Sequence, residues 1–226
     1  MGWQHVVGSF DAVILDHDGT IVDSHAAMLR AYATWAEEFD VDLEKLPTYL
    51  GMPSRALTKA LVAEDRWSAA AIRIEELEVT DTAGVAAMPG AAETLRVLPA
   101  GAVAVATSCT RRLLDARMAA AGLPLPRVVV TRDQVANGKP APDSFLLAAE
   151  QLGVEPSRAL VVEDSLAGIA AARAGGFPVL GILSTHSPDV LRADVHVTDL
   201  SQVTWEVTHD GIRAVVAWGN GDHQAT

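Results

Sequence analysis

Short apolar runs recur along the chain and predict buried strands. Each run is rich in β-branched or small apolar residues and is nearly continuous, without regular alternation with polar residues. This pattern is typical of strands that are buried on both faces of a sheet. The predicted strands occupy residues 12–15, 102–106, 127–130, 159–163, 178–182 and 194–197.

Between these runs lie stretches with the apolar spacing of helices. Several begin with Thr, Ser or Asp, which cap helix N-termini, and several end on glycine. Because strands alternate with helices of this length, the sequence predicts an α/β fold with a doubly wound, Rossmann-like parallel sheet. Asp143 is expected to be an N-cap. The predicted helices occupy residues 90–98, 110–122, 143–153 and 165–176.

One interval breaks this alternation. Residues 24–88 contain helical stretches and no convincing strand, and the interval is far too long for an ordinary loop. We therefore expect an inserted α-helical cap domain at residues 24–88, and a core domain formed by residues 1–23 and 89–226. The helical stretches of the insert lie at residues 25–39, 54–62 and 68–78.

The two ends of the chain carry weaker signals. Residues 204–218 suggest a hairpin that turns at Asp210 and Gly211. The N-terminus lacks the basic start and the apolar stretch of a signal peptide, and no segment approaches the roughly 18 apolar residues of a membrane helix. We expect a cytoplasmic protein that does not act at a membrane.

Composition narrows the range of partners. The chain has 226 residues and a formal charge of −12, with no run rich in lysine or arginine. This balance argues against nucleic acid or an anionic membrane as the main partner. The single cysteine, Cys109, cannot form an internal disulfide, which suits a reducing compartment. We expect a monomer or a weak homo-oligomer.

Polar residues gather where predicted strands end and in one loop before a helix. Ligands bind at the carboxyl ends of strands in open parallel sheets, so these residues are candidates for a functional site. Each one alone has a structural explanation, such as an Asp-Gly turn, a solvated lysine or a helix start. Their combination in this order favours a shared chemical role. The candidates are Asp16, Asp18, Thr107, Ser108, Lys139, Glu163 and Asp164.

Four short motifs carry these residues: DHDGT at 16–20, ATS at 106–108, GKP at 138–140 and VVEDS at 161–165. With these motifs in this order, the chain resembles the haloacid dehalogenase (HAD) superfamily over essentially the whole core domain. The helical insert is similar to the small α-helical cap of the β-phosphoglucomutase-like subgroup. Segments such as TWAEEF and EVTDTAGVAAMPGA are similar to those of sugar- and polyol-phosphate phosphatases. The resemblance implies a phosphatase that acts on a small phosphorylated metabolite.

The resemblance also implies a role for each motif residue. Asp16 would be the nucleophile that forms an aspartyl-phosphate, and Asp18 would be the general acid and base. Thr107 and Lys139 would hold the phosphoryl oxygens, and Ser108 would bind substrate. A hard cation such as Mg²⁺ would offset the repulsion among clustered carboxylates. The expected metal ligands are Asp16, Asp18 through its backbone carbonyl, Glu163 and Asp164.

Four further residues lie near these motifs or in the insert. Gly51 and Arg55 fall where caps of this subgroup carry a substrate-specificity loop, so both are candidates for binding substrate. A solvent-facing helix arginine is the alternative for Arg55. His17 stands between the two aspartates, but side chains alternate near a strand end, so it is expected to point away from the metal. Cys109 is expected to be a small buried side chain and not a nucleophile.

Three other functions stay open at this point. A phosphosugar mutase of the same fold would pass the phosphoryl group to a sugar hydroxyl. Such mutases usually carry a histidine four residues beyond the position of Ser24, and this chain has Met28 there, which favours hydrolysis. A 2-haloacid dehalogenase would lack the second aspartate, which is present here as Asp18. A non-catalytic binding module would not need the complete set of chemical residues.

Overall fold

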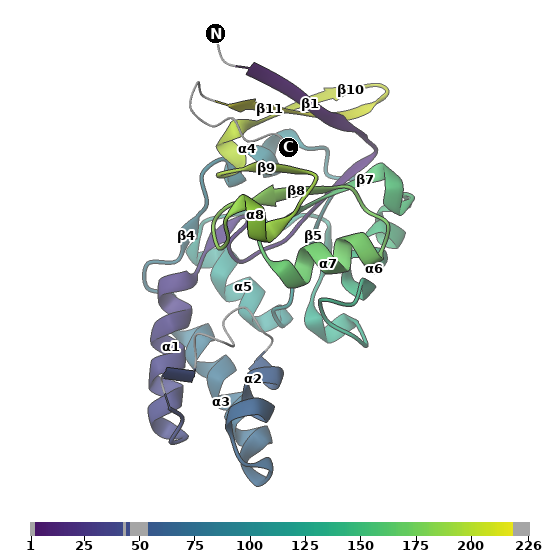
Figure 1. Cartoon of the computed structure of the whole chain (residues 1–226). Helices are drawn as coiled ribbons and strands as arrows, with labels where there is room; N and C mark the ends of the chain where they lie inside the picture. The colour runs from purple at the N-terminus through teal and green to yellow at the C-terminus, as the bar shows by residue number, and fades with distance from the viewer. Residues whose placement is uncertain (1–2, 43, 46–53, 219–226) are drawn as a thin grey trace.

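The computed structural model describes residues 3–42, 44–45 and 54–218. Helices α1–α3 lie at one end of the molecule, a three-stranded antiparallel sheet lies at the other, and a six-stranded parallel sheet lies between them (Figure 1). The predicted α/β architecture is confirmed. Among the described helices, none combines the length and the apolar character that crossing a membrane requires.

The parallel sheet has the strand order β6-β5-β2-β7-β8-β9. From β2 the chain moves outward through β5 and β6, then returns to add β7, β8 and β9 on the other side of β2. The topological switch point therefore lies between β2 and β7, where ligands bind in sheets of this kind. The strands are β2 (Ala12–Leu15), β5 (Val103–Ala106), β6 (Val128–Val130), β7 (Ala159–Glu163), β8 (Val179–Ile182) and β9 (Val195–Val197).

Both faces of this sheet are covered, as the continuous apolar runs predicted. Alternate side chains of β2 enter different cores: Val13 and Leu15 pack on the side of α4 and α5, whereas Ala12 and Ile14 pack on the side of α6 and α7. All four of these β2 residues are fully buried. The helices are α4 (Ala91–Val97), α5 (Arg111–Ala120), α6 (Asp143–Leu152), α7 (Leu166–Ala174) and the short α8 (Pro188–Leu191).

The inserted helices are α1 (His25–Glu38), α2 (Ser54–Leu61) and α3 (Trp67–Thr80). They bury an apolar cluster of their own, in which the Trp35 indole N–H also donates to the Ala70 carbonyl at 2.9 Å. Two short strands, β3 (Val22–Asp23) and β4 (Ala86–Ala87), pair antiparallel where the insert leaves and rejoins the sheet. Strand β4 lies in the interval where no strand was expected, because two residues are too few to give a pattern.

The second sheet joins the two ends of the chain in the order β1-β11-β10. Strands β10 (Val203–Thr208) and β11 (Gly211–Trp218) form the predicted hairpin, and β1 (Trp3–Phe10) pairs antiparallel with β11. Strand β1 was not predicted, because its partner lies at the far end of the chain. Short 3-10 helices occupy Glu64–Arg66 (η2), Arg132–Gln134 (η3), Pro156–Arg158 (η4) and Leu200–Gln202 (η5).

Candidate active site

Three carboxylates meet at the switch point of the parallel sheet. Asp16 follows β2, Glu163 is the last residue of β7, and Asp164 follows it. Because β2 and β7 are neighbouring parallel strands, their carboxyl ends bring these residues together. One carboxylate oxygen of each lies within 4.8 Å of the others, and all three side chains are buried. We call this group the carboxylate cluster.

Lys139 inserts its ammonium group into the carboxylate cluster. Its Nζ donates to Asp16 Oδ1, to Glu163 Oε1 at 2.8 Å and to the carbonyl of Ala106 at 3.3 Å. Within the described residues, no hydrogen bond reaches the other Asp16 oxygen, Oδ2. Three carboxylates against one ammonium leave a formal charge of −2 (−3 + 1) when all four groups are ionised.

The pKa values show that this negative charge is in excess. Burial raises the pKa of Asp16 well above its usual value; Glu163 and Asp164 add to this, while Lys139 opposes it. Burial and then Glu163 raise the pKa of Asp164 to about 7, against hydrogen bonds from Thr185 and Ser184. A buried pocket of oxygen atoms that holds its protons this tightly is suited to a cation.

The backbone around Glu163 and Asp164 accepts only glycine at two positions. Gly168, on α7, faces Glu163 so closely that a Cβ there would lie 1.6 Å from Oε1. Gly19 has a φ of +80°, and a Cβ there would lie 2.2 Å from Asp164 Oδ2. The Ser184 hydroxyl keeps Gly19 close to Asp164, because it donates to the Gly19 carbonyl at 2.6 Å. These glycines let helix α7 and the loop after β2 approach the carboxylate cluster closely.

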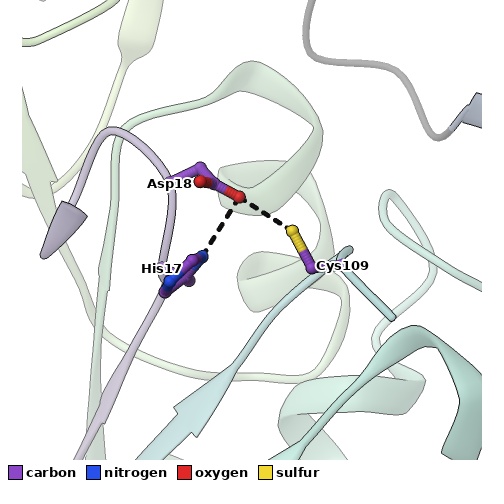
Figure 2. Close-up of side chains that lie close together, drawn as sticks. All are labelled: His17, Asp18 and Cys109. Atoms are coloured by element: carbon purple, nitrogen blue, oxygen red, sulfur yellow. Dashed lines mark hydrogen bonds and ion pairs between the residues drawn. The ribbon is translucent and has the colours of Figure 1, made fainter. Parts of the chain in front are cut away.

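Asp18 points away from the carboxylate cluster into a second group of side chains. Its Oδ2 lies 3.1 Å from His17 Nδ1 and accepts from the Cys109 thiol at 2.9 Å (Figure 2). Its Oδ1 meets Arg117 Nη1 at 2.9 Å and accepts from the Ser24 hydroxyl at 2.5 Å. Burial opposes ionisation, but His17, Arg117 and the hydrogen bonds outweigh it and hold the pKa of Asp18 well below its usual range.

Arg117 connects Asp18 to the inserted helices. Its second terminal nitrogen, Nη2, donates to Glu78 Oε1 on α3 at 2.9 Å, and both side chains are buried. A neighbouring contact, from the Thr110 hydroxyl to Glu75 at 2.6 Å, also joins α5 to α3. Burial raises the pKa of Glu78 to about 7, with Arg117 opposing it and Asp18 adding to it.

Sequence reasoning missed Arg117, because a basic residue in a helix usually lies at the surface. A signal was nevertheless available in its position. The buried residues of α5 are Leu113, Leu114, Arg117 and Met118, so Arg117 stands on the apolar stripe of the helix. A charged residue on such a stripe needs a partner of opposite charge, and here it has the buried Glu78 and the partly buried Asp18.

Comparison with known proteins agrees with this architecture. The family described as haloacid dehalogenase-like hydrolase matches residues 10–176. The chain belongs to this family. This HAD-family hydrolase is 35% identical over 199 residues to hexitol phosphatase A of Escherichia coli (strain K12), a match that covers 84% of the chain and 92% of that protein.

Two further similarities are informative. Over 210 residues the hydrolase is 34% identical to validoxylamine A 7'-phosphate phosphatase of Streptomyces hygroscopicus subsp. limoneus, with 87% of the chain and 97% of that protein covered. A crystal structure of a putative β-phosphoglucomutase from Thermotoga maritima superposes with a TM-score of 0.65 at 29% identity, covering 85% and 95% of the two chains. The resemblance to the β-phosphoglucomutase-like subgroup and to phosphatases is therefore confirmed.

The structure places the other predicted residues of this HAD-family hydrolase as follows. Thr107 is buried just after β5, and its hydroxyl accepts from the Cys109 backbone N–H at 3.0 Å; Ser108 is partly buried beside it. Gly51 lies outside the described residues. Arg55 lies in α2, but its side chain is not among the parts of the chain that the structure describes.

Asp143 does not cap α6, contrary to the prediction. Pro142 occupies the N-cap position, and Asp143 is the first residue of the helix. The Asp143 carboxylate instead accepts from the backbone N–H and the side-chain amide of Asn137, both at 3.1 Å. It therefore fixes the loop that carries Lys139, because Asn137 lies two residues before that lysine. A carboxylate in a first helical turn looks the same in sequence whether it caps the helix or binds a loop.

Proposed function

We propose that this hydrolase is a Mg²⁺-dependent phosphatase of small sugar or polyol phosphates that works through an aspartyl-phosphate on Asp16. The observation that carries the proposal is the carboxylate cluster with Lys139 at the switch point of the sheet. The similarity to hexitol phosphatase A and to validoxylamine A 7'-phosphate phosphatase supports the substrate class. We also propose the division into a core, residues 1–23 and 89–226, and a cap, residues 24–88.

The donor set fits a hard divalent cation. It consists of oxygen atoms, it is buried, and its formal charge of −2 matches Mg²⁺. The side chains of Asp16 and Asp164, with the backbone carbonyl of Asp18, would hold the ion. Glu163 already accepts from Lys139 and from the Ser165 backbone N–H, so we assign it the positioning of Lys139. When bound, Mg²⁺ would offset the charge of the phosphate ester.

The residues of the chain then divide the reaction between them. Asp16 attacks phosphorus through Oδ2, the oxygen that Lys139 does not contact, and the bond from phosphorus to the ester oxygen breaks. Thr107 and Lys139 hold the phosphoryl oxygens during this transfer. Asp18 gives a proton to the leaving oxygen, then takes one from the water that hydrolyses the aspartyl-phosphate.

Asp18 must leave Arg117 before it can do this. In the described arrangement its pKa is held low and Oδ1 is paired with Arg117, so it carries no proton to donate. Because Arg117 also binds Glu78 of α3, a shift of the cap relative to α5 would alter the hold on Asp18. We propose that binding of substrate under the cap releases Asp18 in this way.

A screen of phosphate release tests the proposed function. Hexitol phosphates, sugar phosphates and nucleotides would be incubated with the full chain, with and without Mg²⁺. We expect Mg²⁺-dependent release that is fastest from polyol or sugar phosphates. Asp16→Asn should abolish release, because an amide is a poor nucleophile. Release by Asp16→Asn at the parent rate, or no release from any ester, would overturn the proposal.

The mutase alternative can be separated in one assay. Met28 packs against the apolar cluster of the inserted helices, and a thioether cannot take a proton from a sugar hydroxyl. We therefore expect β-glucose 1-phosphate, primed with its bisphosphate, to yield inorganic phosphate. Formation of glucose 6-phosphate at a comparable rate would identify a mutase instead.

A further inference from the structure

A second cluster of metal-ligating side chains lies beside the carboxylate cluster. It consists of His17, Asp18 and Cys109, whose nitrogen, oxygen and sulfur atoms lie within 4.8 Å of one another. Figure 2 shows the imidazole and the thiol both directed at one carboxylate oxygen of Asp18. The residues come from the ends of β2 and β5, which are neighbouring parallel strands. Arg117 of α5 contacts Asp18 of this cluster, whereas Asp16 contacts Lys139.

His17 provides an independent sign that this cluster has a ligand. The side chain is fully buried, and within the described residues neither ring nitrogen makes a hydrogen bond of adequate geometry. Its Nδ1 nevertheless lies 3.1 Å from Asp18 Oδ2. A buried polar group without a partner is costly, so such groups are nearly always satisfied in native proteins. A cation bound at this point would satisfy Nδ1.

We propose that His17, Asp18 and Cys109 form a binding site for a borderline or soft divalent cation of the Zn²⁺ class. Thiolate and imidazole ligands select such cations, whereas Mg²⁺ prefers oxygen atoms alone. Zn²⁺ binds sulfur at about 2.3 Å and nitrogen or oxygen at about 2.0 to 2.2 Å. The observed separations of 3.1 Å and 2.9 Å therefore need only a small expansion to admit the ion. Water could supply the fourth ligand.

Arg117 does not exclude a cation from this site. It approaches Asp18 through Oδ1, whereas His17 and Cys109 face Oδ2. Its Nη1 also donates to Cys109 Sγ at 3.5 Å, and a thiolate sulfur has further lone pairs with which to bind a metal ion. Binding forms a metal–sulfur bond and releases the thiol proton of Cys109 to solvent. The divalent ion and Arg117 then contribute three positive charges (2 + 1), which balance Asp18, the Cys109 thiolate and, when it is ionised, Glu78.

The consequence for activity rests on the proposed function. An Asp18 carboxylate that ligates Zn²⁺ through Oδ2 can neither donate nor accept the catalytic proton. Occupation of this second site should therefore inhibit phosphate release even when Mg²⁺ saturates the carboxylate cluster. Because the two sites differ in ligand softness, an excess of Mg²⁺ should not relieve the inhibition.

Titration with Co²⁺, in the presence of saturating Mg²⁺, tests the site without reference to activity. Cys109 is the only cysteine of the chain, so a sulfur-to-cobalt charge-transfer band can arise only from this residue. We expect the band to saturate at one Co²⁺ per chain. It should disappear in Cys109→Ser, and Co²⁺ affinity should fall by at least about tenfold in His17→Leu. The matched control is His209→Ala, an exposed histidine of the β10–β11 hairpin, which should titrate like the parent.

A measurement on the unmodified chain guards against variants that fail to fold. X-ray absorption at the zinc edge of the Zn²⁺-loaded parent should show one sulfur and at least one imidazole ligand. A shell of oxygen atoms alone, or the absence of the cobalt band, would overturn the site. Inhibition by Zn²⁺ without a sulfur ligand would do the same, because it would assign the inhibition to the carboxylate cluster.

The two proposals fail in different ways. A cobalt band in a chain that hydrolyses no phosphate ester supports the metal site and overturns the proposed function. Hydrolysis of a phosphate ester by a chain that shows no cobalt band supports the proposed function and overturns the metal site. Where both proposals hold, the Zn²⁺ concentration that halves the rate of phosphate release should be at least about tenfold higher in Cys109→Ser than in the parent. Each protein is compared with its own rate in the absence of Zn²⁺. An unchanged value in this variant would overturn inhibition through the site.

Discussion

At the scale of single residues, the motif DHD distributes three neighbouring side chains between two chemical environments. Asp16 joins Lys139 and the carboxylate cluster, whereas His17 and Asp18 join Cys109 and Arg117. The two aspartates therefore have pKa values displaced in opposite directions, Asp16 upward and Asp18 downward. In enzymes that use one carboxyl group as a nucleophile and a second one in proton transfer, the nucleophile is ionised and the acid is protonated. The shifts observed here run the other way, so the proposed roles require a bound cation to ionise Asp16 and release from Arg117 to let Asp18 take up a proton.

The close approach of Gly168 to Glu163 gives a prediction at this scale. In Gly168→Ala the new methyl group would overlap Glu163 Oε1, so Glu163 must move and release Lys139. We expect kcat/KM for phosphate release to fall by about tenfold to a hundredfold, since small misplacements near reacting groups have effects of this size. Gly101→Ala, where nothing lies within 4 Å of the added Cβ, is the matched control. Equal kinetics in both variants would contradict the assigned role of Glu163.

The residue identities at the strand ends could be predicted from the sequence, but their partners could not. Asp16, Lys139, Glu163 and Asp164 all lie in short motifs that follow strands or precede helices, and the structure brings them together. Which group binds Asp18 depends on how α5 is rotated about its own axis and on where α3 lies against it. Neither quantity is encoded in a local pattern.

At the scale of elements, α5 carries the information that sequence reasoning lacked. Its N-cap, Thr110, was expected, and the hydroxyl accepts from the Leu113 N–H at 3.3 Å. Its buried charge was not expected, although Arg117 stands on the apolar stripe. The helix thereby contacts the parallel sheet, Asp18 and the inserted α3 at once. A rigid element with these three contacts can transmit a displacement of the cap to the active site.

A double-mutant cycle tests the contact between α5 and α3. Arg117→Met should lower the free energy of unfolding by about 3 to 5 kcal/mol, because it leaves Glu78 buried without a counter-ion. Glu78→Gln should cost less, since Arg117 keeps Asp18 as a partner. The double variant should be more stable than additivity predicts by at least about 1 kcal/mol, measured by urea denaturation. Strict additivity would show that the two side chains do not interact in solution.

The same contact should be visible in the pH dependence of stability. Burial raises the pKa of Glu78 from 4.5 to about 7, so the folded chain binds this proton more tightly than the unfolded chain. Its stabilising contribution is therefore complete below pH 4.5 and is lost as the pH rises through about 7. The neutral amide of the Glu78→Gln variant has no proton to lose over this range.

Unfolding of the parent and of Glu78→Gln should therefore be compared in buffers from about pH 5 to about pH 8. The difference in free energy of unfolding should shift in favour of the variant as the pH rises, by at most about 3 kcal/mol, and become constant above the pKa of Glu78. A constant difference over the whole range would mean that Glu78 does not titrate within it. A shift in favour of the parent would mean that Arg117 outweighs burial.

At the scale of the whole molecule, the sequence predicted the parallel sheet and its helices but not how the chain ends meet. The runs that became β2, β5 and β7 are continuous and apolar because both faces of these strands are covered. Strand β1 has no such run, because it lies outside the doubly covered sheet and pairs with β11. Pairings between the two ends of a chain leave no local signal, so they must come from the structure.

This second sheet stabilises the molecule at a distance from the chemistry. Trp205 on β10 packs into the same core as Leu15 and Leu114, and its indole N–H donates to the Thr94 hydroxyl on α4 at 2.9 Å. Figure 1 places β10 at the end of the molecule opposite to α1–α3. Trp205→Ala should therefore reduce the free energy of unfolding by about 3 to 5 kcal/mol through loss of packing.

Trp205→Phe separates packing from hydrogen bonding, because it keeps most of the buried apolar surface and loses only the donor to Thr94. It should cost about 1 to 3 kcal/mol, less than the alanine variant. Both variants should retain the kcat of the parent at temperatures well below their unfolding transitions, because in the described part of the chain Trp205 bonds to Thr94 on α4 and the carboxylate cluster to Lys139, with no shared partner. A fall in kcat that tracks the loss of stability across the two variants would show instead that this sheet positions the ends of β2 and β7.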